Sequence, residues 1–224
     1  MKSFLRFYLL ATLVVFLCSC SEKLEFEGDG TLELAFDLNT ESAGLNKTQS
    51  GNLSFTTGFI RIIEVEFEAE WAGDSSIYVE REQVTTVDFA TGAVTPPLNL
   101  VVPAGEYEEV SLEVGIFDEN DQPAMVFEGS YTKTDGTVVP IVLEVPGGET
   151  FEVSGEQVTI ASNVAALATL TFDPVSWFNG VRATALDRAR VNASGKLLIS
   201  EYFNEDIFDL VMDGLDRQTE AHFE

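Results

Sequence analysis

The chain has almost none of the side chains on which nucleophilic and transition-metal chemistry depends. Its 224 residues include two cysteines, Cys18 and Cys20, and one histidine, His222, close to the C-terminal end. A histidine-based triad or a histidine-ligated zinc or haem site would have to be built on a terminal segment, where chains fray. No glycine-rich loop joins a predicted strand to a predicted helix, since Pro146-Gly147-Gly148 lies between two strand-like segments. These absences argue against several large classes of enzyme.

Positive charge is also scarce. Lysine and arginine total 12 against 38 aspartate and glutamate residues, which gives a net charge of −26. Such a charge repels phosphate backbones and anionic headgroups, so we exclude nucleic acid as a partner. The hydrophobic fraction of 45% and the 17 phenylalanines predict a packed core rather than a disordered acidic chain.

The N-terminal segment has the layout of a bacterial signal peptide. Lys2 and Arg6 supply the positive region, and residues 7–17 form an apolar stretch that is too short to span a bilayer. The following Leu17-Cys18-Ser19-Cys20 resembles a lipobox, in which the last cysteine is lipidated and becomes the first mature residue. We therefore expect a signal peptide over residues 1–19 and a lipid on Cys20. The protein is then held to the outer membrane by that lipid, facing the periplasm or the cell surface.

This interpretation also removes both cysteines from the chemistry of the mature domain. Cys18 leaves with the leader and Cys20 carries the lipid, so disulfides, thiolate metal sites and cysteine nucleophiles are excluded. Residues 20–30 are expected to form an acidic tether. Acidic residues after the lipidated cysteine resemble the surface-export signals of Bacteroidota-type lipoproteins, and the alternative is a plain solvated linker. We expect no cofactor.

Strand-like alternation runs from residue 31 to about residue 172, interrupted by turns and by the polar residues 40–51, which are predicted to form a loop. The strongest segment is residues 59–71, with an expected apolar face of Phe59, Ile63, Val65, Phe67, Ala69 and Trp71. Its other face is expected to carry Glu64, Glu66, Glu68 and Glu70. Further strands are predicted at Ile77–Glu82, Val84–Phe89, Leu98–Val102, Glu106–Ile116, Ala124–Tyr131, Val138–Val145, Phe151–Val153, Gln157–Ile160 and Ala166–Phe172. Many short strands with no long helical period between them predict an all-β, antiparallel β-sandwich.

The C-terminal end has a different pattern. Asn204 is a candidate cap for a short helix near residues 205–220, and the acids that follow it suit a first helical turn. Residues 181–190 fit either another short helix or an irregular connection. We therefore expect a sandwich domain over residues 31–178 and a C-terminal extension over residues 179–224.

Acidic residues suggest two weak metal candidates. Four glutamates along one strand lie roughly 6.6 Å apart, whereas calcium requires about six to eight oxygens within about 2.6 Å, so a solvated outer face is the favoured interpretation. Asp118, Asn120 and Asp121 supply oxygen ligands in a predicted hairpin loop without the glycine and glutamate of an EF-hand. An ordinary polar turn is the simpler interpretation there, and we predict no metal site.

Aromatic residues allow two interpretations as well. Trp71, Trp177 and Phe178 could form a platform for a sugar ring, or they could pack in the core. Core packing is favoured because Trp71 continues the apolar face of its strand, and the other two follow Pro174 at a strand exit.

One short motif is more specific than strand alternation. Pro103-Ala104-Gly105-Glu106-Tyr107 resembles the turn that opens a strand in prealbumin-like and immunoglobulin-like sandwich domains. With Gly129-Ser130-Tyr131 and residues 168–178 downstream, it resembles a β-sandwich domain of unknown function that recurs in Bacteroidota-type lipoproteins. The similarity spans residues 30–178. It implies the fold and supplies no catalytic residues.

The expected function is that of a non-enzymatic cell-envelope lipoprotein that binds a ligand or mediates adhesion, with a glycan or a protein as partner. One alternative is a structural or anchor subunit of a surface assembly, because exposed strand edges accept strands from partners. Another is a hydrolase that uses carboxylates or calcium, for which no pair among the 38 acids stands out.

Overall fold

The structure, a computed structural model, describes residues 28–41, 43–46, 49–71, 75–118, 122–216 and 220–222. The described strands are β1 Asp29–Leu38, β2 Ala43–Asn46, β3 Gln49–Trp71, β4 Ser75–Asp88, β5 Ala93–Thr95, β6 Asn99–Pro103, β7 Gly105–Ile116, β8 Met125–Thr132, β9 Val138–Val145, β10 Thr150–Ile160, β11 Ala165–Phe172, β12 Leu197–Ile199 and β13 Glu220–His222. The described helices are α1 Pro174–Trp177, the 3-10 helix η1 Phe178–Gly180, α2 Ala183–Arg188 and α3 Glu205–Leu215. The predicted mostly-β fold is confirmed.

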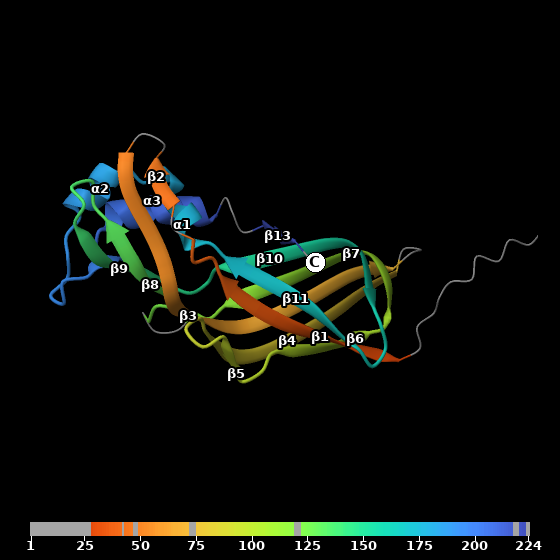
Figure 1. The fold of residues 1–224 in the computed structure, drawn as a ribbon. Coiled ribbons are helices and arrows are strands. Elements are labelled where there is room, and N and C mark those ends of the chain that lie inside the picture. Colours follow the sequence, from red (N-terminus) through yellow and green to blue (C-terminus); the bar gives the residue numbers. More distant parts are fainter. Residues whose placement is uncertain are drawn as a thin grey trace, which may run out of the picture.

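The 23-residue strand β3 runs through the whole molecule. Its first part pairs with β8 over Asn52–Ile60, and its second part pairs with β7 over Ile62–Trp71. On its other edge it pairs with β2 near its start and with β4 from Phe59 onward. Figure 1 shows the result, in which β3 joins a helical half (β2, β8, β9, β12 and the helices) to a two-layer half (β4, β7, β10 and a second sheet).

In the two-layer half, a separate three-stranded sheet in the order β11-β1-β6 lies across the strands β4, β3, β7 and β10. Phe172 at the end of β11 packs its ring 4.9 Å from that of Phe151 in β10 and 5.8 Å from that of Phe89, measured between centroids. The residues of β1 alternate between buried and exposed, as expected for a strand with one face on a core. The two sheets therefore bury one common apolar layer.

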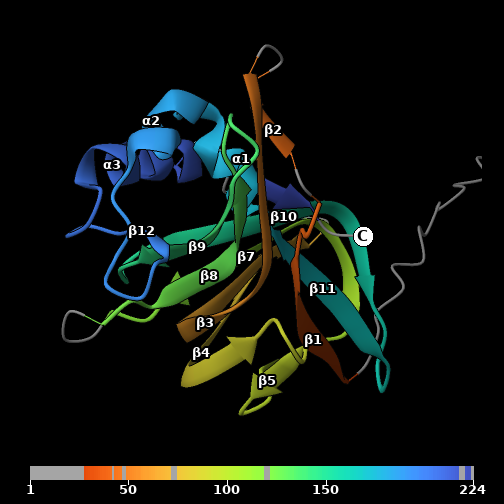
Figure 2. The same cartoon turned by 60° about the vertical axis from the view of Figure 1, so that its left-hand side comes forward.

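In the helical half, the helices cover the inner face of β3 and β8, as Figure 2 shows. Phe178 packs 5.8 Å from Phe55 of β3, and Trp177 packs 5.4 Å from Phe127 of β8. These two aromatic residues are buried, so the expected core role holds for them. Within the described ranges, no helix is long and apolar enough to cross a membrane.

A carboxylate fastens α2 to the hairpin between β8 and β9. Asp187 accepts hydrogen bonds from the hydroxyl of Tyr131 at 2.8 Å and from the backbone N–H of Thr134 at 3.2 Å. Burial raises the pKa of Asp187, but a hydrogen bond from the Thr134 hydroxyl, these two hydrogen bonds and the charge of Lys133 outweigh it, and the net shift is downward. The carboxylate is thus held ionised in its hydrogen-bonded position.

The predicted purely antiparallel pairing is wrong. β1 pairs with β11 in parallel, β12 pairs with β9 in parallel, and β13 pairs with β10 in parallel. Alternation in the sequence reports which face of a strand is buried but carries no information on strand direction. Parallel neighbours need a long connection, and here the whole chain from β2 to β10 separates β1 from β11.

The predicted apolar face of β3 is also wrong in part. Ile60 and Ile62 are fully buried, whereas Phe59 and Ile63 are only partly so. The register shifts between Ile62 and Glu64, so Ile63 is an extra residue in a β-bulge. A bulge exchanges the two faces of a strand, because the residues beyond it are displaced by one position.

The C-terminal helix begins where it was predicted but ends at Leu215, and Glu220 belongs to the strand β13. α3 begins after Asn204, and residues 183–188 form the short helix α2. The Asn204 side chain does not cap α3; its amide group donates to the backbone oxygens of Leu198 at 2.7 Å and Arg190 at 2.9 Å. Asn204 adopts a left-handed conformation at a φ of 58°, and its side-chain oxygen accepts a hydrogen bond from the backbone N–H of Arg190.

A glycine substitution tests the tight packing between β3 and β8. A Cβ atom on Gly129 would lie 1.9 Å from the backbone oxygen of Ser54, whereas a Cβ on Gly115 would meet nothing closer than 3.6 Å. We expect Gly129→Ala to lower the free energy of unfolding by about 1–3 kcal/mol. Gly115→Ala, the matched control, should change it by no more than about 0.5 kcal/mol. Urea denaturation of both variants measures this, and equal effects would contradict the packing described.

Candidate functional site

The outer surface of the two-layer half is a glutamate face. We define it by the exposed or half-buried side chains Glu64, Glu66, Glu68, Glu70, Glu80, Glu82, Glu109, Glu113, Glu152 and Glu156. The pairing registers place Glu80, Glu66, Glu113 and Glu152 side by side across β4, β3, β7 and β10. Like charges directly opposite one another on neighbouring strands are destabilising. The sheet therefore concentrates repulsion on this face.

One carboxyl group on the glutamate face holds its proton near neutral pH. A hydrogen bond to Glu66, together with burial and the charges of Glu66 and Glu80, raises the pKa of Glu64 to about 7. A protonated carboxyl can donate a hydrogen bond to its neighbour, whereas two carboxylates can only repel each other. Protonation of Glu64 thus relieves part of the repulsion.

The same region brings three carboxylates together. Oxygen atoms of Glu64, Glu80 and Glu82 lie within 4.8 Å of one another. They could supply three ligands to a divalent cation, with water supplying the others. The spacing argument from sequence considered β3 alone and missed this convergence, because two of the three side chains come from β4.

The other residues considered from sequence lie elsewhere. Asp118 follows the end of β7 as an exposed residue, whereas Asn120, Asp121 and Cys20 lie outside the described residues. The loop candidate for calcium and the lipidation site therefore stay predictions. Trp71 stacks on Tyr107 with ring centroids 5.7 Å apart and is half-buried against the core.

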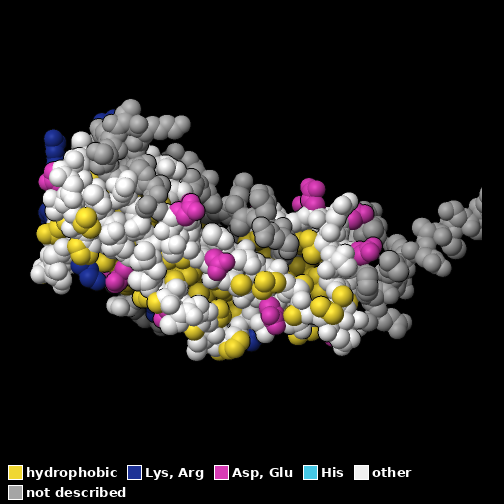
Figure 3. Space-filling model, in the orientation of Figure 1, with side chains coloured by type: hydrophobic (Ala, Val, Ile, Leu, Met, Phe, Trp, Pro, Cys, Tyr) yellow, Lys and Arg dark blue, Asp and Glu magenta, His cyan; other side chains and the backbone are white. Residues whose placement is uncertain are grey.

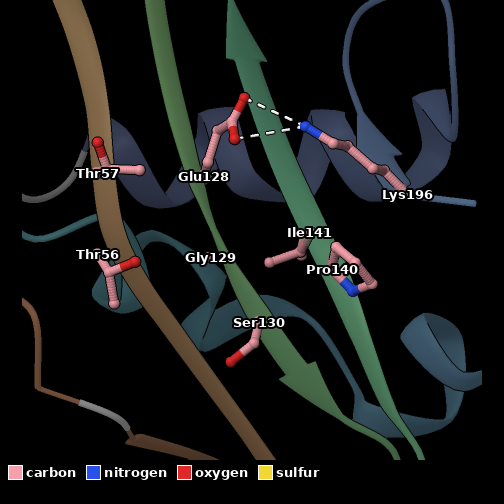
Figure 4. A pocket seen from close by; sticks show the side chains of 8 residues that line it. All are labelled: Thr56, Thr57, Glu128, Gly129, Ser130, Pro140, Ile141 and Lys196. Atoms are coloured by element: carbon pink, nitrogen blue, oxygen red, sulfur yellow. Dashed lines mark hydrogen bonds and ion pairs between the residues drawn. The ribbon is translucent and has the colours of Figure 1, made fainter. Parts of the chain in front are cut away.

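A polar groove lies on the outer face of the helical half, on the side of the sheet away from the helices (Figure 4). Its volume is about 260 Å³. It is lined by Thr56, Thr57, Glu128, Gly129, Ser130, Pro140, Ile141 and Lys196. Three strands, β3, β8 and β9, therefore contribute, together with the residue that precedes β12.

A bulge in β3 shapes one wall of the groove. The register with β8 shifts between Phe55 and Thr57, which leaves Thr56 as the extra residue. Bulges are common beside binding sites because they redirect side chains without ending the sheet. Gly129, on the facing strand β8, has no side chain that could fill the groove. Its close approach to the backbone of β3 leaves no room for a Cβ atom.

An ion pair crosses the groove. The Lys196 ammonium group lies 3.4 Å from both carboxylate oxygens of Glu128. The two side chains are 38% and 45% exposed. Such an exposed pair contributes at most about 1 kcal/mol to stability. Glu128 and Lys196 can therefore exchange their contact with each other for contacts with a polar ligand at little cost in free energy.

A second groove, of about 380 Å³, lies between α2 and the start of α3. Arg188 and Arg190 line one part of it, and Glu205 and Asp206 line another. The Arg190 guanidinium lies 4.7 Å from the centre of the Phe203 ring. This groove carries both signs of charge and lies at the junction of the two helices.

A pH series tests the proton held by Glu64. Its raised pKa means that the folded state binds this proton more tightly than the unfolded state, so stability should fall as pH rises from about 4.5 to about 7. We expect Glu64→Gln to flatten this slope and to raise the Tm at pH 7.5 by on the order of 2 °C. Glu156→Gln removes the same charge from the same face as a control. Identical slopes in both variants, measured by thermal unfolding, would contradict the assignment.

The groove was missed from sequence because its residues come from four separate stretches of the chain. Each stretch alone has the ordinary pattern of a strand. The only sequence signal for the groove is Thr56-Thr57-Gly58, which breaks the apolar alternation of its strand. The bulge that aligns these residues exists only in the paired sheet. Comparison of the chain with protein-family models, with curated proteins and with solved structures gives no match.

Proposed function

We propose that this protein is a non-enzymatic lipoprotein of the bacterial cell envelope, held to the outer membrane by a lipid on Cys20. Its layered sheets form a β-sandwich related to prealbumin-like or immunoglobulin-like domains, and the polar groove binds a ligand. The lipobox-like Leu17-Cys18-Ser19-Cys20 supports the anchor. The groove is the observation that carries the binding function.

The chemistry of the groove favours a ligand rich in hydroxyl groups. The hydroxyls of Thr56, Thr57 and Ser130 both donate and accept, Glu128 accepts and Lys196 donates. A volume of about 260 Å³ is slightly below the range of pockets that enclose a drug-sized molecule. The groove therefore suits one polar unit of a larger ligand, such as a sugar ring of a glycan.

The position of the groove suits a surface-binding role. β1 starts at the end of the molecule opposite α2 and α3, as Figure 1 shows. A lipid on Cys20 is separated from Gly28 by eight residues, which reach at most about 29 Å when extended. The anchored end thus stays near the membrane, and the groove lies in the half of the molecule that is farther from the anchor.

A structural or anchor subunit of a surface assembly is the second candidate. The observation in its favour is the open edge of β11, which pairs with β1 over Ala165–Phe172. A carboxylate- or calcium-dependent hydrolase ranks below both, because its support is limited to the convergence of Glu64, Glu80 and Glu82.

Glycan-array binding tests the proposal with the chain from Glu22 onward. Loss of one charged hydrogen bond costs about 1.5–3 kcal/mol, which corresponds to roughly 10- to 150-fold in Kd. We expect Lys196→Gln to weaken glycan binding by such a factor. Arg188→Gln, which removes the same charge from α2, should leave it unchanged. Absence of glycan binding at high protein concentration, or equal binding by both variants, would sink the proposal.

A further inference from the structure

The strand β11 has one edge without a backbone partner. It pairs with β1 along its full length, and no other described strand pairs with it. Among the described residues, the hydrogen bond from the Asn39 N–H to the Phe172 oxygen, at 2.8 Å, is the one backbone bond that β11 makes beyond that pairing. An open edge presents a row of N–H and C=O groups that can pair with another strand.

The other edges of the described sheets are short, blocked or charged. β4 pairs with β5 only over Thr86–Asp88, and the rest of its outer edge carries Glu80, Arg81 and Glu82. β6 ends at Pro103, and the Asn99 oxygen on it accepts a hydrogen bond from the Arg81 guanidinium. β5, β12 and β13 have three residues each. By contrast, β11 has eight residues with no charge and no proline. Proteins protect edges by these means, so β11 stands out as unprotected.

The strand β11 and the turn before it lack the charge found elsewhere on the chain. Residues 157–172 contain no charged side chain in a protein of net charge −26. Leu167 is 55% exposed and Val164 is 59% exposed, and Val101 on β6 of the same sheet is 63% exposed. Figure 3 shows apolar side chains gathered over the part of the molecule where β11 and β1 lie. The nearest carboxylates in the register are Glu33 and Asp37 of β1, beside Leu167 and Thr171. Two like-charged copies can therefore meet at the edge of β11 with the β1 carboxylates one strand back from the contact.

We propose that β11 is the dimerisation edge of this protein, where two copies pair their β11 strands antiparallel about a two-fold axis near Thr169. The two sheets then become one sheet in the order β6-β1-β11-β11-β1-β6. An even register keeps the exposed side chains of both strands, Leu167 among them, on the same face. The contact is self-complementary, as a two-fold interface requires.

The size of this contact sets its strength. Standard complexes bury about 1,200–2,000 Å² of surface. Two paired eight-residue strands and their neighbours bury less surface than this, so we expect a weak dimer in solution. If the chain carries the proposed lipid, both copies are confined to a membrane, and the effective concentration rises. The edge pairing itself does not depend on the polar groove or on its ligand.

Cysteine cross-linking tests the geometry in the full-length protein in membranes. The sequence has no cysteine beyond Cys20, so Thr169→Cys, Leu167→Cys and Thr171→Cys each add a single thiol to the domain. Residues near a two-fold axis lie within disulfide reach of their own copies. We expect one of these positions to give a sharp maximum of disulfide-linked dimer. The parent protein and Val138→Cys, at a site that is 62% exposed on β9, should give none.

Sedimentation of the full-length protein in detergent tests the dimer without a covalent bond. Leu167→Lys places a charge on each strand at the paired edge, so we expect at least a tenfold weaker dimer, although the change lowers the net negative charge. Val138→Lys makes the same charge change elsewhere and should leave the dimer intact. Circular dichroism checks that both variants fold. A monomeric parent protein, uniform cross-linking at all positions, or equal dissociation of both lysine variants would overturn the proposal.

Discussion

The rest of the structure depends on the unbroken pairing of β3 through both halves of the molecule. Its neighbours on one edge are first β8 and then β7, and on the other edge first β2 and then β4. The aromatic core follows the same path. The Phe127 ring lies 6.3 Å from that of Phe172 in the second sheet and 5.4 Å from that of Trp177 in α1. The core is therefore continuous from the helices to the three-stranded sheet.

The bulges in β3 explain how one strand serves two differently built halves. Each extra residue, Thr56 or Ile63, exchanges the faces of the strand and increases its twist. The first bulge lies at the polar groove. The second precedes Glu64 and thus places the glutamates on the outer face. The polar groove and the glutamate face therefore both depend on a β-bulge in β3.

The charges of the protein are distributed unevenly between these halves. The glutamate face belongs to the two-layer half, whereas four of the twelve basic residues, Arg182, Arg188, Arg190 and Lys196, fall within fifteen residues of the helical half. A sheet face of like charges opposes folding, and buried apolar side chains on the reverse of the same strands offset it. Val65 and Phe67, which alternate with the glutamates, are fully buried.

Local patterning predicted the position of most longer strands, but residues 40–51, expected to form a loop, contain β2 and the start of β3. The strand Val138–Val145 has the predicted bounds, and α3 follows Asn204 as expected. The predicted apolar face of β3 was wrong at Ile63, because a bulge arises from the pairing with partner strands and not from the residue itself. The groove and the cluster of Glu64, Glu80 and Glu82 were not predicted, for a related reason. Their members are far apart in sequence, and register decides which of them meet.

The central claim, that β3 makes the two halves one cooperative unit, can be measured with the two tryptophans. Trp71 stacks on Tyr107 in the two-layer half, and Trp177 packs on Phe127 in the helical half. Trp71→Phe and Trp177→Phe each leave one fluorescent reporter. For each single-tryptophan variant, urea unfolding followed by fluorescence and by circular dichroism should give one shared midpoint and slope. A fluorescence midpoint that departs from the circular dichroism midpoint within either variant would show that the halves unfold separately and contradict the account.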